Sequence, residues 1–119
     1  MGTDWIKRIL VVGAGTMGHP LAQTFAEGGY SVALVDLNRK TLDKAASLIV
    51  SNLRTLEHLH LLEEGRGNEI MERIHFLASL EEGARDADVA IEVIFEDLRG
   101  KGRAIRTIGN ALPIENDPR

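Results

Sequence analysis

A glycine-rich turn near the N-terminus limits the folds open to this chain more than any other feature. The six residues from Gly13 to Gly18 follow the pattern G-x-G-x-x-G. The apolar run 6–12 before them is typical of a strand, and residues 17–27 after them repeat apolar side chains at helical spacing. A strand, a glycine-rich turn and a helix in this order predict the first unit of an α/β dinucleotide-binding fold.

Each glycine of the turn has its own physical role in that interpretation. Gly13 allows the tight turn, Gly15 lets the backbone approach a pyrophosphate, and Gly18 lets the helix pack close to the strand. The pyrophosphate then lies on unpaired N–H groups at the positive end of the helix. A purely structural strand-to-helix turn is the alternative. The predicted cofactor-binding residues of the turn are Gly13, Ala14, Gly15, Thr16, Met17 and Gly18.

An acidic residue after the second predicted strand supports cofactor binding. Asp36 follows the apolar run 30–35 and stands 21 residues after Gly15. A carboxylate there can accept hydrogen bonds from the ribose hydroxyls of adenosine, and it repels a 2′-phosphate. NAD is therefore favoured over NADP, although Arg39 and Lys40 nearby act against that preference. The alternative for Asp36 is a solvated carboxylate at a strand end.

The rest of the pattern predicts an α/β Rossmann-type parallel sheet, truncated to about four strands. Apolar residues recur at three- and four-residue steps over 40–61, and a second, shorter helix continues to Arg73. We expect these helices to form a helical hairpin insertion, 41–73, between the second and third strands. The third and fourth strands are expected at 74–77 and 89–95.

The last part of the chain does not read as a strand. Residues 99–119 contain Gly100, Gly102 and Gly109, each of which weakens a helix by about 1 kcal/mol. An irregular or helical tail is therefore expected. Taken as a whole, residues 1–119 are interpreted as one partial NAD-binding Rossmann domain.

Composition excludes several other classes of function. The sequence has 18 acidic and 14 basic residues and a net charge of −4, which favours neither nucleic acid nor an anionic membrane surface. Without cysteine, a disulfide framework, a thiolate metal site and a cysteine nucleophile are excluded. His58 and His60 are two residues apart on a helix, a poor spacing for a metal pair, so no metal is expected. The apolar runs are too short to span a membrane, and the start lacks the pattern of a signal peptide. A soluble, cytoplasmic protein is expected.

Several motifs in register resemble the NAD-binding domain of the 3-hydroxyacyl-CoA dehydrogenase family. They are GAGTMGH (13–19), VDL (35–37), SLEE (79–82) and DADVAIEV (86–93), followed by Glu96 and Lys101 with four residues between them. The resemblance, which includes the helical hairpin, covers about residues 5–105. It implies oxidation of L-3-hydroxyacyl-CoA to 3-ketoacyl-CoA in fatty-acid or butanoate metabolism. By the same resemblance Glu96 and Lys101 lie beside the cofactor, and the hairpin helps to contact the CoA of an acyl-CoA substrate.

Three departures from the family pattern affect what the resemblance implies. Pro20 replaces the usual glycine, which makes GTMGHPLA similar to hydroxyisobutyrate dehydrogenases. Leu59 stands where a basic residue contacting CoA is expected. The catalytic histidine of the family belongs to a His-Phe-x-Asn-Pro-like segment after the fifth strand, and His75-Phe76 is not that motif. No catalytic residue is therefore predicted.

Three hypotheses follow. The first is the NAD-binding portion of a 3-hydroxyacyl-CoA dehydrogenase, with the catalytic half absent from this chain. The second is a stand-alone NAD-binding or regulatory module without hydride transfer. The third is an NAD dehydrogenase of the hydroxyisobutyrate or gulonate type.

The predicted strand order also bears on assembly. In the order 3-2-1-4, residues 89–95 lie at an edge of the sheet and carry mostly apolar side chains. Edges of this kind recruit other strands, so a homo-oligomer is expected. The alternative is that the 99–119 tail folds back over the edge and leaves a monomer.

Overall fold

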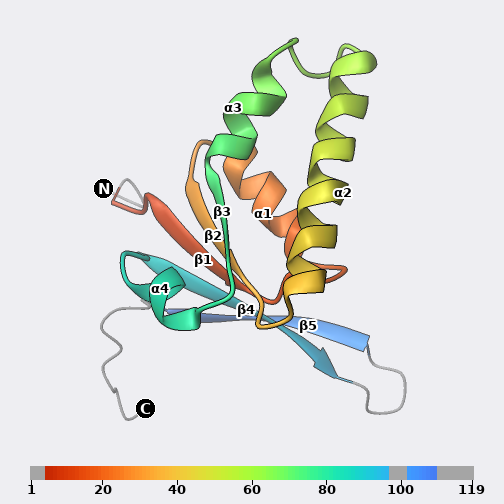
Figure 1. The fold of residues 1–119 in the computed structure, drawn as a ribbon. Coiled ribbons are helices and arrows are strands. Elements are labelled where there is room, and N and C mark those ends of the chain that lie inside the picture. The colour runs from red at the N-terminus through yellow and green to blue at the C-terminus, as the bar shows by residue number, and fades with distance from the viewer. Residues whose placement is uncertain (1–4, 97–101, 110–119) are drawn as a thin grey trace.

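The fold is an α/β sandwich built on a mostly parallel sheet (Figure 1). The computed structural model describes residues 5–96 and 102–109. The elements, in chain order, are β1 (Arg8–Val12), α1 (Gly18–Glu27), β2 (Ser31–Val35), α2 (Arg39–His58), α3 (Arg66–Glu72), β3 (Ile74–Leu77), α4 (Leu80–Ala84), β4 (Val89–Glu96) and β5 (Gly102–Gly109).

The sheet has the strand order β3-β2-β1-β4-β5. The first four strands run parallel, with Val32 of β2 opposite both Ile9 and Ile74, and Ile9 also opposite Val89. This is the 3-2-1-4 half of a Rossmann fold, so the predicted fold class is confirmed. Because the carboxyl ends of these four parallel strands all lie at the same end of the sheet, the residues that follow β1 and β2 lie next to one another.

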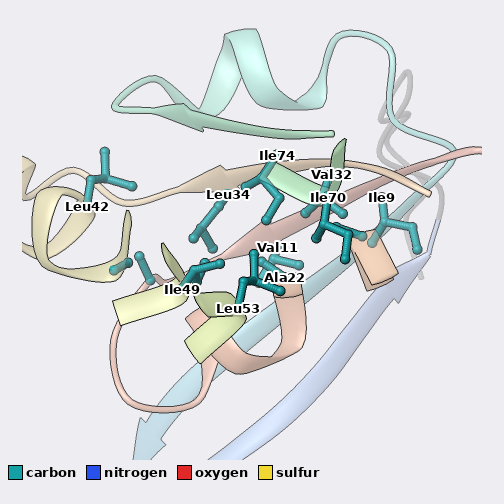
Figure 2. Close-up of a cluster of buried hydrophobic side chains, with 13 residues drawn as sticks. Ile9, Val11, Ala22, Val32, Leu34, Leu42, Ile49, Leu53, Ile70 and Ile74 are labelled. Atoms are coloured by element: carbon teal, nitrogen blue, oxygen red, sulfur yellow. The ribbon is translucent and has the colours of Figure 1, made fainter. Parts of the chain in front are cut away.

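The core lies on both faces of the sheet because side chains of a strand alternate between its faces. On one face Ile9 and Val11 pack under α1, α2 and α3 (Figure 2). On the other face Leu10 packs in a smaller cluster beside α4. The long helix α2 directs Leu42, Ala45, Ile49 and Leu53 into the larger cluster, at steps of three, four and four residues. Burying each large aliphatic side chain of α2 stabilises the fold by about 1.5–3 kcal/mol. The apolar spacing in the sequence therefore predicted this helix correctly.

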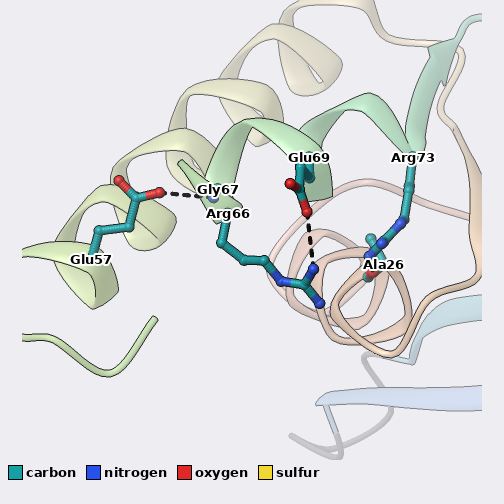
Figure 3. Close-up of polar contacts among 6 residues, drawn as sticks. All are labelled: Ala26, Glu57, Arg66, Gly67, Glu69 and Arg73. Carbon is teal, nitrogen blue, oxygen red and sulfur yellow. Dashed lines mark hydrogen bonds and ion pairs between the residues drawn. The ribbon is translucent and has the colours of Figure 1, made fainter. Parts of the chain in front are cut away.

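The predicted helical hairpin is confirmed as α2 and α3, and polar contacts fix its shape (Figure 3). The Glu57 carboxylate on α2 accepts a hydrogen bond of 2.7 Å from the backbone N–H of Gly67 in α3. Arg73, at the end of α3, donates from Nη1 to the carbonyl oxygen of Ala26 at 2.6 Å. The hairpin is therefore attached to the C-terminal end of α1 as well as to the sheet.

The prediction of an irregular or helical tail over 99–119 is wrong for residues 102–109, which form β5. This strand pairs antiparallel with β4, from Glu96 opposite Gly102 to Ala90 opposite Gly109. The reason is that two of its eight residues are helix-weakening glycines and three, Ile105, Thr107 and Ile108, are β-branched, a composition that favours a strand. The remaining tail residues, 99–101 and 110–119, lie outside the described residues.

Two further expectations change with β5. The sheet has five strands rather than about four, and β4 is not an open edge, because β5 of the same chain pairs along it. The backbone groups that were expected to recruit another copy are thus already paired. In the part of the chain that the structure describes, no helix is long and apolar enough to cross a membrane.

Candidate cofactor-binding site

The first glycine of the turn lies where a neighbouring strand leaves little room for a side chain. Gly13 follows β1, has a φ of +106°, and donates its N–H to the Val35 carbonyl oxygen at 2.7 Å. A Cβ added there would lie 3.2 Å from the carbonyl oxygen of Val93 in β4. Both the positive φ and the close approach favour glycine, so the turn is held between β2 and β4 by contacts that another residue would disturb.

The last glycine of the turn allows α1 to begin directly against it. A Cβ added at Gly18 would lie 1.6 Å from the Gly13 carbonyl oxygen. The N-cap of α1 is Met17, whose side chain makes no capping hydrogen bond, and the first turn of the helix has no acidic residue. Neither Met17 nor an acidic residue of the first turn therefore caps the positive end of the α1 dipole, an arrangement that suits an anion.

Asp36 lies beside this turn, as the sequence predicted. Its Oδ2 accepts a hydrogen bond of 3.0 Å from the backbone N–H of Ala14, and its Oδ1 accepts one of 2.9 Å from the N–H of Asn38. Asn38 in turn caps α2, because its Oδ1 accepts from the N–H groups of Lys40 and Thr41. The carboxylate thus joins the glycine turn to the start of α2.

A pocket of about 320 Å³ lies between the glycine turn and α2. One of its walls is the turn itself, and the other is the first half of α2. Its lining residues are Ala14, Gly15, Thr16, His19, Thr41, Lys44, Ala45 and Leu48. The pocket brings the turn together with hydroxyl groups and one ammonium group, which are donors suited to an anionic or hydroxyl-rich ligand.

His19 contributes to this pocket in one defined tautomer. Its Nδ1 lies 2.8 Å from the Gly15 carbonyl oxygen. Since a carbonyl oxygen only accepts, Nδ1 carries the proton and Nε2 is left for other contacts. The imidazole is half-buried and holds the centre of the glycine turn in place.

A larger hollow of about 770 Å³ lies at the tip of the helical hairpin. It is lined by Arg54, His58, His60 and their neighbours, and no residue of the glycine turn reaches it. Size alone does not make it the functional site, because three of the residues predicted to bind a dinucleotide, Ala14, Gly15 and Thr16, line the smaller pocket and none lines this hollow. Among the described residues no cluster of histidine and acidic side chains could hold a metal ion.

Comparison with known proteins identifies the fold and its cofactor. The family described as 3-hydroxyacyl-CoA dehydrogenase, NAD binding domain, matches residues 8–115. The chain belongs to this family. Its cofactor is NAD, in agreement with the glycine turn and Asp36.

Individual relatives agree with this assignment. The chain is 32% identical over 108 residues to the "Probable 3-hydroxybutyryl-CoA dehydrogenase" of Bacillus subtilis, covering 91% of this chain and 37% of that protein. It is 29% identical over 108 residues to the human "Hydroxyacyl-coenzyme A dehydrogenase, mitochondrial", covering 87% and 34%. The solved structure of (S)-3-hydroxybutyryl-CoA dehydrogenase from Ralstonia eutropha matches with a TM-score of 0.73 and 30% identity, over 78% of this chain and 32% of that one. The chain spans about a third of the length of these relatives.

The individual cofactor-binding residues stay predictions, and two of them, Glu96 and Lys101, lie outside the glycine turn and the second strand. Glu96 ends β4, at the carboxyl edge of the sheet, and lies opposite Gly102 of β5. Lys101 lies outside the described residues. Sequence reasoning missed two residues of the pocket, Thr41 and Lys44, which are three residues apart on α2. Their spacing places them on one helix face, but only the packing of α2 beside the turn shows that this face lines the same pocket as Ala14 and Gly15.

Proposed function

We propose that this domain binds NAD with the adenosine ribose on Asp36 and the pyrophosphate on the glycine turn. The observation that carries the proposal is the position of the Asp36 carboxylate, which is hydrogen-bonded to Ala14 directly beside the uncapped end of α1. A dinucleotide on the turn would meet the N–H groups at the start of α1 and the carboxylate at the same time. Thr16, Thr41 and Lys44 add donors from the walls of the adjoining pocket.

The reaction we propose is the oxidation of L-3-hydroxyacyl-CoA to 3-ketoacyl-CoA, with NAD accepting the hydride. The family and the names of its relatives support this substrate class. This chain supplies the cofactor-binding part, and the general base comes from outside it, because no segment here has the His-Phe-x-Asn-Pro-like pattern. The acyl-CoA would approach along the helical hairpin.

One observation favours a second candidate, an NAD-binding module without hydride transfer. In a complete Rossmann sheet a parallel fifth strand pairs with the fourth. Here the antiparallel β5 pairs with β4 in that place. Incubation of the chain with NAD and 3-hydroxybutyryl-CoA, followed by the absorbance of NADH, tests what the two candidates share: both expect no turnover by this chain alone, and turnover would contradict both.

Titration calorimetry with NAD and NADP tests the cofactor assignment. The wild type should bind NAD more tightly, because the Asp36 carboxylate repels a 2′-phosphate. Asp36→Ala should weaken NAD binding by about tenfold or more, the cost of losing hydrogen bonds to a charged acceptor. Asp43→Ala is the matched control, since Asp43 is exposed on α2 and does not line the pocket. Tighter binding of NADP by the wild type would overturn the role given to Asp36.

We also propose that the protein self-associates, now through β5 rather than β4. In the described sheet β5 is the last strand, so its outer edge carries backbone groups that no described strand pairs with. Strand edges of this length recruit a second copy. Light scattering at micromolar concentration should show a species larger than 13.1 kDa, and a monodisperse monomer would contradict the proposal.

A further inference from the structure

The carboxylate of Asp36 has more acceptor capacity than the ribose of a cofactor requires. An ionised carboxylate has two oxygens and about four lone-pair directions. Two of these directions are already used in the ligand-free protein, one on each oxygen, by the N–H groups of Ala14 and Asn38. One acceptor direction remains on each oxygen, which matches the two hydroxyls of a ribose.

The partners of Asp36 are parts of the binding site. Ala14 belongs to the glycine turn, is 1% exposed, and lines the pocket beside that turn. Asn38 caps the helix that carries Thr41 and Lys44 on the opposite wall. The backbone N–H of Asp36 donates to the Leu77 carbonyl oxygen at 3.2 Å, which fixes the residue itself to β3. A single anchored carboxylate therefore connects both walls of the pocket.

We propose that Asp36 is a positioning residue as well as a ribose ligand: it holds the glycine turn and the start of α2 in their binding arrangement before the cofactor arrives. The inference rests on the proposed function and deepens it. Ordering a loop costs free energy, and a loop that becomes ordered only on binding lowers the affinity by that amount. A turn that is already ordered before binding therefore binds its ligand more tightly. The benefit extends to any ligand of the turn, including one without ribose hydroxyls.

Asparagine is the informative substitution at this position. A side-chain amide has one oxygen and one NH2 group. In Asp36→Asn only one backbone N–H keeps an acceptor, and the NH2 group faces the other N–H, donor against donor. The shape of the side chain is kept while one of the two attachments is lost.

An NAD analogue without the 2′- and 3′-hydroxyls of the adenosine ribose separates the two roles of Asp36. If Asp36 positions the turn, Asp36→Asn weakens binding of this analogue by about fivefold or more, since one of the two backbone N–H groups, that of Ala14 or that of Asn38, then lacks its charged acceptor. If Asp36 is only a ribose ligand, the analogue binds as tightly or more tightly, because removal of a negative charge near the pyrophosphate favours the anion. Unchanged or tighter binding therefore overturns the proposal. Asp43→Asn, the same change of charge at an exposed site on α2, is the matched control.

Amide hydrogen exchange of the ligand-free wild type gives a second test that needs no cofactor. The Ala14 N–H should be protected, and in Asp36→Asn either it or the Asn38 N–H should exchange at least about tenfold faster. The Gly13 N–H, which donates to Val35, should stay protected and report that the variant is folded. An unprotected Ala14 in the wild type overturns the positioning role. Failure of the wild type to bind NAD, with Ala14 protected, would overturn only the proposed function.

Discussion

Two aspartates at opposite ends of the sheet each accept two backbone N–H groups, but they do so differently. Asp88 precedes β4 at the amino end, where its Oδ2 alone accepts from Lys7 at 2.8 Å and Arg8 at 3.0 Å. Asp36 follows β2 at the carboxyl end and uses both oxygens, one for Ala14 and one for Asn38. The first carboxylate joins the starts of neighbouring strands, whereas the second joins two walls of a pocket.

The space around the backbone also differs between the two ends of the sheet. At the carboxyl end backbone segments are in close contact, and a Cβ on Gly18 would lie 1.6 Å from a carbonyl oxygen. At the amino end Gly29 precedes β2, and a Cβ there would meet nothing within 4 Å. Ligands of parallel α/β sheets bind at the carboxyl ends of the strands. The backbone at Gly18 is therefore much more tightly enclosed than the backbone at Gly29.

The largest expected effect is that of Gly18→Ala at the carboxyl end. The new methyl group cannot occupy its position unless Gly13 or α1 moves, so the turn loses its shape. We expect NAD affinity to fall by about 100-fold or more and the protein to lose about 3 kcal/mol of stability, as in severe overpacking. Calorimetry and thermal unfolding measure the two quantities.

Gly29→Ala is the control at the amino end. Its φ is +101°, so alanine there is strained by about 1 kcal/mol. Because the surrounding space is open, we expect NAD affinity to stay within about twofold of the wild type, as for other sites far from a ligand. If the two variants bind NAD equally, the close contact at Gly18 does not shape the cofactor site.

Lys44→Gln should have a smaller effect at the same end. Lys44 lines the pocket beside the glycine turn and does not belong to the core, and its positive charge should attract a pyrophosphate bound on the turn. We expect NAD to bind about three- to tenfold more weakly at low salt, and the difference to shrink as salt screens the charges. Lys7→Gln makes the same change of charge at the amino end and should leave binding unchanged. Equal losses in both variants would indicate a general effect of net charge.

The sequence predicted the parts of this fold that depend on short-range spacing. The glycine turn, the strand periodicities and the steps from Leu42 to Leu53 each lie within one segment, and they led correctly to the parallel strands and the hairpin. Asp36 was predicted as a ribose ligand because it follows the second predicted strand and stands 21 residues after Gly15. These inferences needed no knowledge of how distant segments pack.

The missed features depend on distant segments. Ala104, Ile105 and Ile108 fit a helix face as well as a strand, and only pairing with β4 decides between them. Lys44 lines the pocket beside the glycine turn because α2 packs against α1, a contact that no local pattern contains. The Ala14 hydrogen bond to Asp36 spans 22 residues and pairs a backbone group with a side chain. The spacing of residues in the sequence predicts that such groups lie near one another, but it does not predict which of their atoms form a hydrogen bond.

The smallest expected effect tests the amino-end aspartate through its pH dependence. The backbone N–H groups of Lys7 and Arg8 hold the pKa of Asp88 below its ordinary range. A carboxyl group whose folded pKa is depressed stabilises the fold above its unfolded pKa, about 3.9, and this contribution is lost as pH falls through the folded value. Urea unfolding at pH 6 and at pH 3 should therefore show a slightly smaller acid loss in Asp88→Asn. Since Asp88 is partly exposed, the difference should be well under about 1 kcal/mol.

The same substitution also distinguishes the two ends of the sheet. At Asp88 one oxygen accepts both N–H groups, so the single oxygen of an asparagine amide can replace it. At Asp36 the two N–H groups need two oxygens, and asparagine supplies only one. Asp88→Asn should therefore keep the wild-type affinity for NAD and the exchange protection of the Lys7 and Arg8 N–H groups, losing only the charge. If it instead released those N–H groups as Asp36→Asn is expected to release Ala14 or Asn38, charge rather than acceptor number would govern both sites.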